Sequence, residues 1–217
     1  MPTLGRHPVG NDVAVGEIDV ANDPYRIVAV PLEIHDGDLW ALYVGARVGH
    51  PTGGSATFEL GIYEMSGSTI TNRIYASGVQ GFAAPVPFDD PTGGYNYIVR
   101  IPAGVKLAGG SRYAIAIRAV SGVLRYGHAN DGTTVHYRDS AAMPDPFNAA
   151  TTSNDGRLSV WLYGRPNRTP EAVILTPANN AVVNDATPDI TVRFVDEDIN
   201  FSEISDIWTL PEEFTAY

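Results

Sequence analysis

The chain has 217 residues, of which 44% are hydrophobic and 18% are charged, so it is long and apolar enough to bury a substantial core. Its 25 Asp and Glu residues against 14 Lys and Arg residues give a net charge of −11, which opposes binding to nucleic acid or to anionic membranes. The absence of cysteine excludes disulfides, thiolate nucleophiles, Cys-based zinc sites and iron–sulfur clusters.

The N-terminal residues 1–7 carry no basic region followed by an apolar stretch, and the chain has no run of about 18 apolar residues that could span a bilayer. We therefore expect synthesis in a cytoplasm without a signal peptide, and no membrane insertion. Every basic residue except Lys106 is an arginine, a bias typical of a high-GC genome.

Short stretches of alternating apolar residues, separated by frequent Gly and Pro, predict an all-β chain. In chain order the predicted strands are residues 26–34, 39–48, 56–64, 95–101, 111–120, 123–126, 133–138 and 158–163. The side chains expected to face the core from the first three are Val28, Val30, Leu32, Ile34, then Trp40, Leu42, Val44, Ala46, Val48, then Phe58, Leu60, Ile62. With no amphipathic helical stretch, this pattern predicts an antiparallel, jelly-roll-like β-sandwich.

The loops between these strands have their own patterns. Residues 51–54 and 91–94 are the same tetrapeptide, Pro-Thr-Gly-Gly, but their flanks do not repeat, so we interpret both as turns. Residues 140–155 form a long irregular segment, which we expect to pack as an ordered loop over the sandwich with Phe147 as its anchor.

A domain boundary is predicted at the Pro- and Arg-rich residues 165–170, which would link a β-sandwich domain of residues 1–164 to a second unit of residues 171–217. In that unit, residues 171–177 and 188–195 have the pattern of the first two strands of an immunoglobulin-like sandwich. Such a sandwich needs roughly 100 residues, so we expect this unit to be an incomplete Ig-like domain or a docking segment.

No catalytic constellation can be assigned: the chain lacks Gly-x-Ser-x-Gly, His-Glu-x-x-His, a Gly-rich phosphate loop and a His-x-His pair. We therefore predict no catalytic residue and no cofactor. His128 and His136 could approach each other across a hairpin, but a structural role explains them more simply. Asp196 and Asp198 offer oxygen ligands for calcium after a strand, yet the EF-hand Gly and terminal Glu are missing, so a solvated loop is the simpler interpretation.

The chain has 11 tyrosines and 3 tryptophans, too many for all of them to be buried on one face of each strand. Several rings should therefore lie near the surface, where a sugar ring could stack on them. The alternative is that these rings fill an interface or form cross-strand pairs. The candidate ligand-binding residues are Tyr43, Tyr63, Tyr95, Tyr126 and Tyr137.

Turn and core positions along nearly the whole chain carry a family resemblance. The segments are Leu4-Gly5, residues 40–48, Gly61-Ile-Tyr-Glu64, residues 101–116, Pro144-Asp-Pro-Phe-Asn148 and Arg157-Leu-Ser-Val-Trp-Leu-Tyr-Gly164. They resemble the β-sandwich domain of minor tail proteins from tailed bacteriophages of high-GC actinobacteria. Residues 168–183, 187–192 and 194–198 are similar to the start of the Ig-like domains that often follow such a sandwich, and the sequence departs from that pattern after Asp198.

The resemblance implies a virion component at the tail tip that acts in assembly or host adhesion and catalyses no reaction. It implies other tail proteins as partners, presentation in several copies or as a homo-oligomer, and a host cell-surface glycan as a ligand. A second hypothesis is a carbohydrate-binding module of a larger bacterial surface protein. An enzyme is a third, because a jelly roll can carry hydrolase carboxylates about 5 to 9 Å apart and Glu33, Glu59 and Glu64 are available, although no spacing favours any pair.

Overall fold

The computed structural model describes residues 3–5, 14–33, 37–129, 131–148, 151–154, 156–166, 171–176 and 191–195. Within these ranges the chain forms fourteen strands and no helix, so no described segment is a helix long and apolar enough to cross a membrane. The chain divides into two compact units, residues 1–165 and residues 166–217.

The first unit is an antiparallel all-β fold of the sandwich type, as the alternation of apolar residues predicts. Its strands are β1 (Thr3–Gly5), β2 (Ala14–Asp19), β3 (Arg26–Glu33), β4 (Leu39–Gly49), β5 (Ala56–Ser66), β6 (Thr69–Ala76), β7 (Gln80–Gly81), β8 (Tyr95–Leu107), β9 (Arg112–His128), β10 (Val135–Asp139), β11 (Thr151–Ser153) and β12 (Val160–Pro166). Five of these, β1, β2, β6, β7 and β11, were not among the predicted strands.

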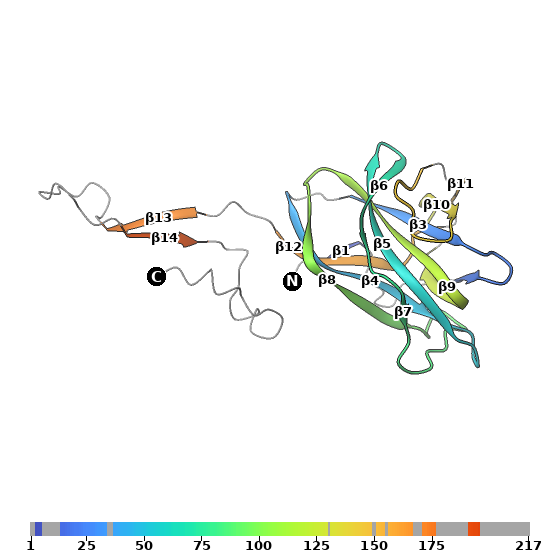
Figure 1. Cartoon of the computed structure of the whole chain (residues 1–217). Helices are drawn as coiled ribbons and strands as arrows, with labels where there is room; N and C mark the ends of the chain where they lie inside the picture. The colour runs from blue at the N-terminus through green and yellow to red at the C-terminus, as the bar shows by residue number, and fades with distance from the viewer. Residues whose placement is uncertain are drawn as a thin grey trace, which may run out of the picture. The chain divides into compact units, whose positions relative to one another are not determined.

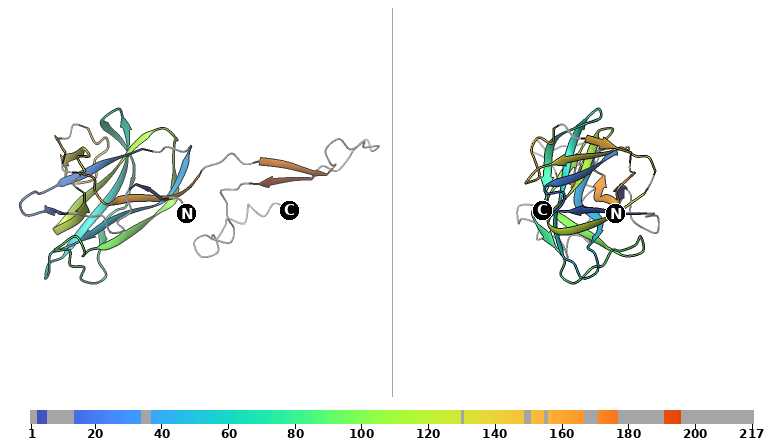
Figure 2. Two further views of the ribbon diagram at one scale, coloured as in Figure 1. Left: turned by 180° about the vertical axis from the view of Figure 1, so that it is seen from behind. Right: turned by 90° about the vertical axis from the view of Figure 1, so that its right-hand side faces the viewer.

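Strand β9 joins the two halves of the fold. Its first part pairs with β3 and β5, and its second part pairs with β2 and the end of β4. The partners change where Val120 bulges out of the ladder and Gly122 adopts a φ of +70°, so the strand bends without ending. The prediction of two separate strands here was wrong for that reason. A single sheet consequently curls around one interior, as Figures 1 and 2 show for the first unit.

Side chains from alternate positions of these strands fill the interior. The inward positions predicted for β5 are confirmed, because Phe58, Leu60 and Ile62 are fully buried in this core. Val28 and Val30 of β3 join them. The strands therefore present their most apolar face to a common interior, which stabilises the fold mainly through the hydrophobic effect.

The inward set predicted for β4 was partly wrong. An irregularity between Ala41 and Tyr43 shifts the register of β4 against β8. Before the irregularity, Leu39 and Ala41 face the core, and after it Val44 and every second residue that follows face the core. Trp40 consequently lies on the outer face, where it is 36% exposed. A period of two cannot reveal a bulge, because one extra residue moves the side chains before it to the other face.

Residues 140–148 cover the outer face of the sheet and form a second, smaller core there. Phe147 and Met143 pack with Ile27 of β3 and Tyr63 of β5, and the rings of Phe147 and Tyr63 meet edge to face at 5.1 Å. Phe147 is buried, so its predicted role as the anchor of this loop is confirmed for the described part of the segment.

A buried ion pair fastens the same segment to the sheet. Arg118 Nε of β9 lies 2.9 Å from Glu59 Oε2 of β5, and the two side chains are 8% and 14% exposed. The same guanidinium donates a hydrogen bond of 2.8 Å to the carbonyl oxygen of Ala141. The loop is therefore held both by apolar packing and by a hydrogen bond from a charged side chain.

Aromatic rings pack over glycines on neighbouring strands. The ring of Trp161 in β12 lies against Gly45 of β4, and the ring of Tyr126 in β9 lies against Gly16 of β2. A Cβ atom at either glycine would approach the ring more closely than 3.0 Å, a separation that real Cβ atoms essentially never show. These glycines are therefore part of the packing rather than sites of chain flexibility.

The second unit contains β13 (Glu171–Thr176) and β14 (Thr191–Val195), which form an antiparallel pair. Both strands lie within the ranges predicted from the sequence. The Ig-like character of this unit stays a prediction, because Asp196, Asp198 and the other residues after 195 lie outside the described residues.

Candidate functional site

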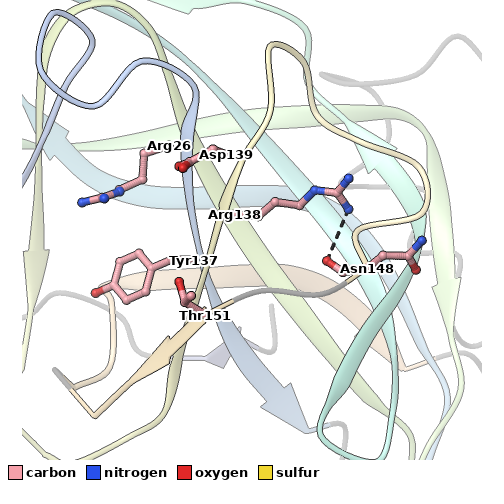
Figure 3. A pocket seen from close by; sticks show the side chains of 6 residues that line it. All are labelled: Arg26, Tyr137, Arg138, Asp139, Asn148 and Thr151. Atoms are coloured by element: carbon pink, nitrogen blue, oxygen red, sulfur yellow. Dashed lines mark hydrogen bonds between the residues drawn. The ribbon is translucent and has the colours of Figure 1, made fainter.

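Two depressions of the first unit share Tyr137 of β10 as a wall. The first has a volume of about 330 Å³ and is drawn in Figure 3. Its lining residues are Arg26, Tyr137, Arg138, Asp139, Asn148 and Thr151. Strand pairing creates it, because Arg26 of β3 lies opposite Asp139 of β10, and Tyr137 lies opposite Thr151 of β11.

Both arginines of the first depression have defined contacts. Arg26 forms an ion pair of 3.1 Å with Asp23, and its guanidinium carbon lies 5.9 Å from the centre of the Tyr137 ring. Arg138 points away from Tyr137 in Figure 3 and donates hydrogen bonds of 3.0 and 3.3 Å to the carbonyl oxygens of Pro146 and Asn148. Arg138 is therefore held by the loop that covers the sheet.

The second depression has a volume of about 410 Å³ and lies where inward-facing residues of β9 and β10 reach the end of the core. Its lining residues are Tyr126, His128, Gly132, Val135, Tyr137, Asn154, Gly156 and Leu158. Two aromatic rings, an imidazole and an amide thus surround one space. This combination of apolar walls and hydrogen-bonding groups is typical of small-ligand sites.

Asp131 organises the rim of the second depression. Its carboxylate accepts hydrogen bonds of 3.0 Å from the backbone N–H groups of both Thr133 and Arg157. Burial acts to raise the pKa of Asp131, but a hydrogen bond from the Thr133 hydroxyl, the two backbone hydrogen bonds and the Arg157 charge together lower it. A further hydrogen bond of 3.2 Å joins the Thr134 hydroxyl to Asn154. The rim is therefore fixed by the ionised form of Asp131.

The five tyrosines predicted as an exposed set do not share one surface. Tyr63 is fully buried under the covering loop, where its hydroxyl donates to the carbonyl oxygen of Pro144 at 3.0 Å and burial raises its pKa. Tyr126 is only 8% exposed, so the expected exposure was wrong for both residues. Tyr63 points outward but the covering loop buries its ring, whereas Tyr126 is buried because it faces the main core.

The other three tyrosines keep some exposure. Tyr95 is 57% exposed, as predicted, and Tyr43 and Tyr137 are half-buried. Of the five, the structure brings only Tyr126 and Tyr137 together, at the second depression. The sugar-binding role of these residues stays a prediction.

The two histidines singled out from the sequence lie on different faces of the fold. His128 lines the second depression with Tyr137, whereas His136 precedes Tyr137 in β10 and therefore points to the opposite face. Burial, together with the charge of Arg112, lowers the pKa of His136. Among the described residues, no group of three or more His, Asp or Glu side chains is placed to hold a metal ion.

The carboxylates considered for hydrolysis are not paired with each other in the described structure. Glu59 is bound to Arg118, and Glu64 accepts a hydrogen bond of 2.9 Å from the amide of Asn72. The side chain of Glu33 lies outside the described residues, as do the calcium candidates Asp196 and Asp198. Glu59 is thus the structural partner of Arg118.

Arg26, Arg138 and Asn154 were missed by sequence reasoning. They reach the site through the pairing of β3, β10 and β11, and no local pattern indicates which distant strands pair.

Comparisons with known proteins identify no relative of this chain: no family model matches it, and neither a curated protein nor a solved structure matches it.

Proposed function

We propose that the protein is a non-enzymatic structural component of a phage virion, a minor tail or tail-tip protein that acts in tail assembly, in adhesion to the host surface, or in both. The proposal begins from the resemblance of the sequence to minor tail proteins. It adds other tail proteins as partners and several copies of the chain in each particle, so that weak contacts at single sites sum to strong attachment.

One observation carries the proposal: the segments responsible for the resemblance are the ones that build the scaffold. Residues 101–116 contain the end of β8, the start of β9 and the turn between them, where the Tyr113 hydroxyl accepts a hydrogen bond of 2.7 Å from the N–H of Ala108. Residues 144–148 contain the loop anchor Phe147, and residues 157–164 contain the buried Trp161. The similarity therefore concerns packing positions, as expected for relatives that share a structural role.

Purified phage particles provide the test. We expect mass spectrometry of washed virions to detect the protein, and an antibody against it to label the tail tip in electron micrographs. Particles that lack the protein, while known capsid and tail proteins of the same preparation are detected, would refute the proposal.

A carbohydrate-binding module of a larger bacterial surface protein is the second candidate. The two depressions beside Tyr137 and the exposed Tyr95 favour it, since aromatic and polar side chains together suit sugar rings. This candidate predicts that the chain occurs at the surface of cells that carry no phage. Detection only in particles would exclude it.

A further inference from the structure

The second depression lies where the interior of the sandwich opens. The buried side chains of Leu124 and Tyr126 in β9 face this interior, and His128 continues the same face to the end of the strand. Val135 and Leu158, each 1% exposed, belong to the core and also line the depression, so they form its apolar floor. The mouth of a β-barrel is a common position for a ligand site, and this opening of a curled sheet is comparable.

Two polar side chains of the depression have hydrogen-bonding groups to spare. Among the described residues, the half-buried His128 imidazole contacts the ring of Tyr126, at 6.1 Å between centres, and makes no hydrogen bond. The amide oxygen of Asn154 accepts a hydrogen bond of 3.2 Å from the Thr134 hydroxyl, while its NH₂ group has no partner in the same part of the structure. Both groups would gain partners from a ligand that carries hydroxyls.

Tyr137 forms a wall of the depression whose position is fixed before any ligand binds. The guanidinium carbon of Arg26 lies 5.9 Å from the centre of its ring, and the Ser153 hydroxyl lies 3.5 Å from its hydroxyl. A ring held in this way loses little conformational freedom on binding, which favours affinity.

Charged side chains beside the depression are paired with each other. Arg157 Nε at the rim lies 3.6 Å from Asp131 Oδ2, and Arg26, next to Tyr137, forms its ion pair with Asp23. None of the described residues that line the depression is Asp, Glu, Lys or Arg. A carboxylate or phosphate of a ligand would therefore lose water there without meeting an unpaired cation, which is unfavourable. The depression consequently suits an uncharged ligand with an apolar face and hydroxyl groups at its edge.

We propose that the second depression binds one neutral sugar ring. The C–H face of the pyranose lies against the rings of Tyr126 and Tyr137, and its hydroxyls form hydrogen bonds with the side chains of His128 and Asn154. The volume of about 410 Å³ is sufficient, since small-ligand sites occupy about 300 to 1,000 Å³. The inference rests on the proposed function and deepens it, because it names an uncharged glycan unit as the host-surface ligand that adhesion would use.

Saturation-transfer NMR of the full chain with single-sugar probes tests the ligand class. The probes are the methyl glycosides of glucose, galactose and mannose, the uronic acid that corresponds to each, and adenosine, a flat ring that can also stack on tyrosine. We expect at least one neutral glycoside to bind, and to bind more tightly than its own uronic acid. Absence of binding by all three neutral glycosides, tighter binding of the uronic acids, or binding of adenosine alone overturns the proposal.

Removal of one hydrogen-bonding group tests the location. Asn154 is exposed, so Asn154→Ala should fold normally, and it should weaken binding of the best glycoside about threefold to tenfold through loss of one hydrogen bond. Asn72→Ala is the matched control. Asn72 is also exposed, its amide also bonds to one side chain, that of Glu64, and it lines neither depression, so its removal should leave the affinity unchanged.

Two ring substitutions complete the test. His128→Phe keeps a flat ring without the imidazole nitrogens, and we expect it to weaken binding by a factor similar to that of Asn154→Ala. Tyr137→Ala should weaken binding about tenfold, whereas Tyr95→Ala should leave it unchanged although Tyr95 is the more exposed ring. If neither Asn154→Ala nor His128→Phe differs from the Asn72→Ala control, the location is overturned. This outcome is independent of the proposed function, which fails only if the protein is absent from virions.

Discussion

Gly122 is the position at which a single methyl group should most disturb the first unit. It lies in the middle of β9, where that strand passes from one half of the sheet to the other, and its φ is +70°. A Cβ atom there would overlap the carbonyl oxygen of Ser55, which also accepts a hydrogen bond of 3.3 Å from the N–H of Val123. Gly122→Ala therefore combines backbone strain with a collision against backbone atoms that cannot rotate away.

The size of the effect follows from these two contributions. An L-residue in the left-handed region costs about 1 to 2 kcal/mol. Overpacking against fixed atoms adds about 1 to 3 kcal/mol, and loss of the Ser55 hydrogen bond adds about 1 kcal/mol. We expect Gly122→Ala to lower the free energy of unfolding by about 3 to 6 kcal/mol, which corresponds to a decrease in Tm of about 6 to 24 °C for a domain of this size.

Gly53→Ala is the matched control, because Gly53 has a φ of +74° and nothing lies within 4 Å of the added Cβ. It should show the strain alone, a decrease in Tm of about 2 to 8 °C. Thermal unfolding followed by circular dichroism measures both variants. If Gly122→Ala and Gly53→Ala lower Tm equally, the contact with Ser55 has no energetic weight and the reasoning about β9 is wrong.

Three further predictions concern other contacts. Gly45→Ala should lower the free energy of unfolding in urea by about 1 to 3 kcal/mol, because the fully buried Trp161 ring occupies the space of the new methyl group; an unchanged midpoint would contradict this packing. Because burial lowers the pKa of His136, the unfolded chain binds a proton that the folded chain resists, so stability should be full above pH 6.5 and decline as the pH falls below it. His136→Gln should flatten that decline across a pH series of urea melts, and an identical slope would refute the assignment. Phe147→Ala should uncover Tyr63, and the raised pKa of its phenol should return toward 10.0 in an ultraviolet titration; a retained high pKa would show that the loop stays in place.

The strand content of the fold was predictable from the sequence because alternation of apolar residues is a local property. Phe58, Leu60 and Ile62 follow it without interruption, and all three lie in the core. The failures occur where one residue interrupts the period, at Trp40 beside the irregularity in β4 and at Gly122 in β9. Positive-φ glycines and bulges have no periodic signature, so sequence reasoning split β9 into two strands.

The candidate site was only partly predictable. Tyr126 and Tyr137 were named because rings are numerous, but the choice of five tyrosines could not separate them from Tyr63, which the covering loop buries. Arg26 was not named at all, since its position depends on the register between β3 and β10. Exposure depends on which loop covers which face of the sheet, and a strand pattern contains no such information.

Part of the packing of the first unit lies apart from the rim of the second depression. Two contacts of large buried rings, Trp161 over Gly45 and Phe147 against Tyr63, involve no residue that lines the second depression. The rim of that depression depends instead on Asp131, whose hydrogen bonds to backbone N–H groups fix short segments at the end of the sandwich. Loops on a rigid β scaffold can change without loss of the core. Substitutions at the rim should therefore alter ligand affinity with little effect on Tm, and substitutions under Trp161 or Phe147 should do the reverse.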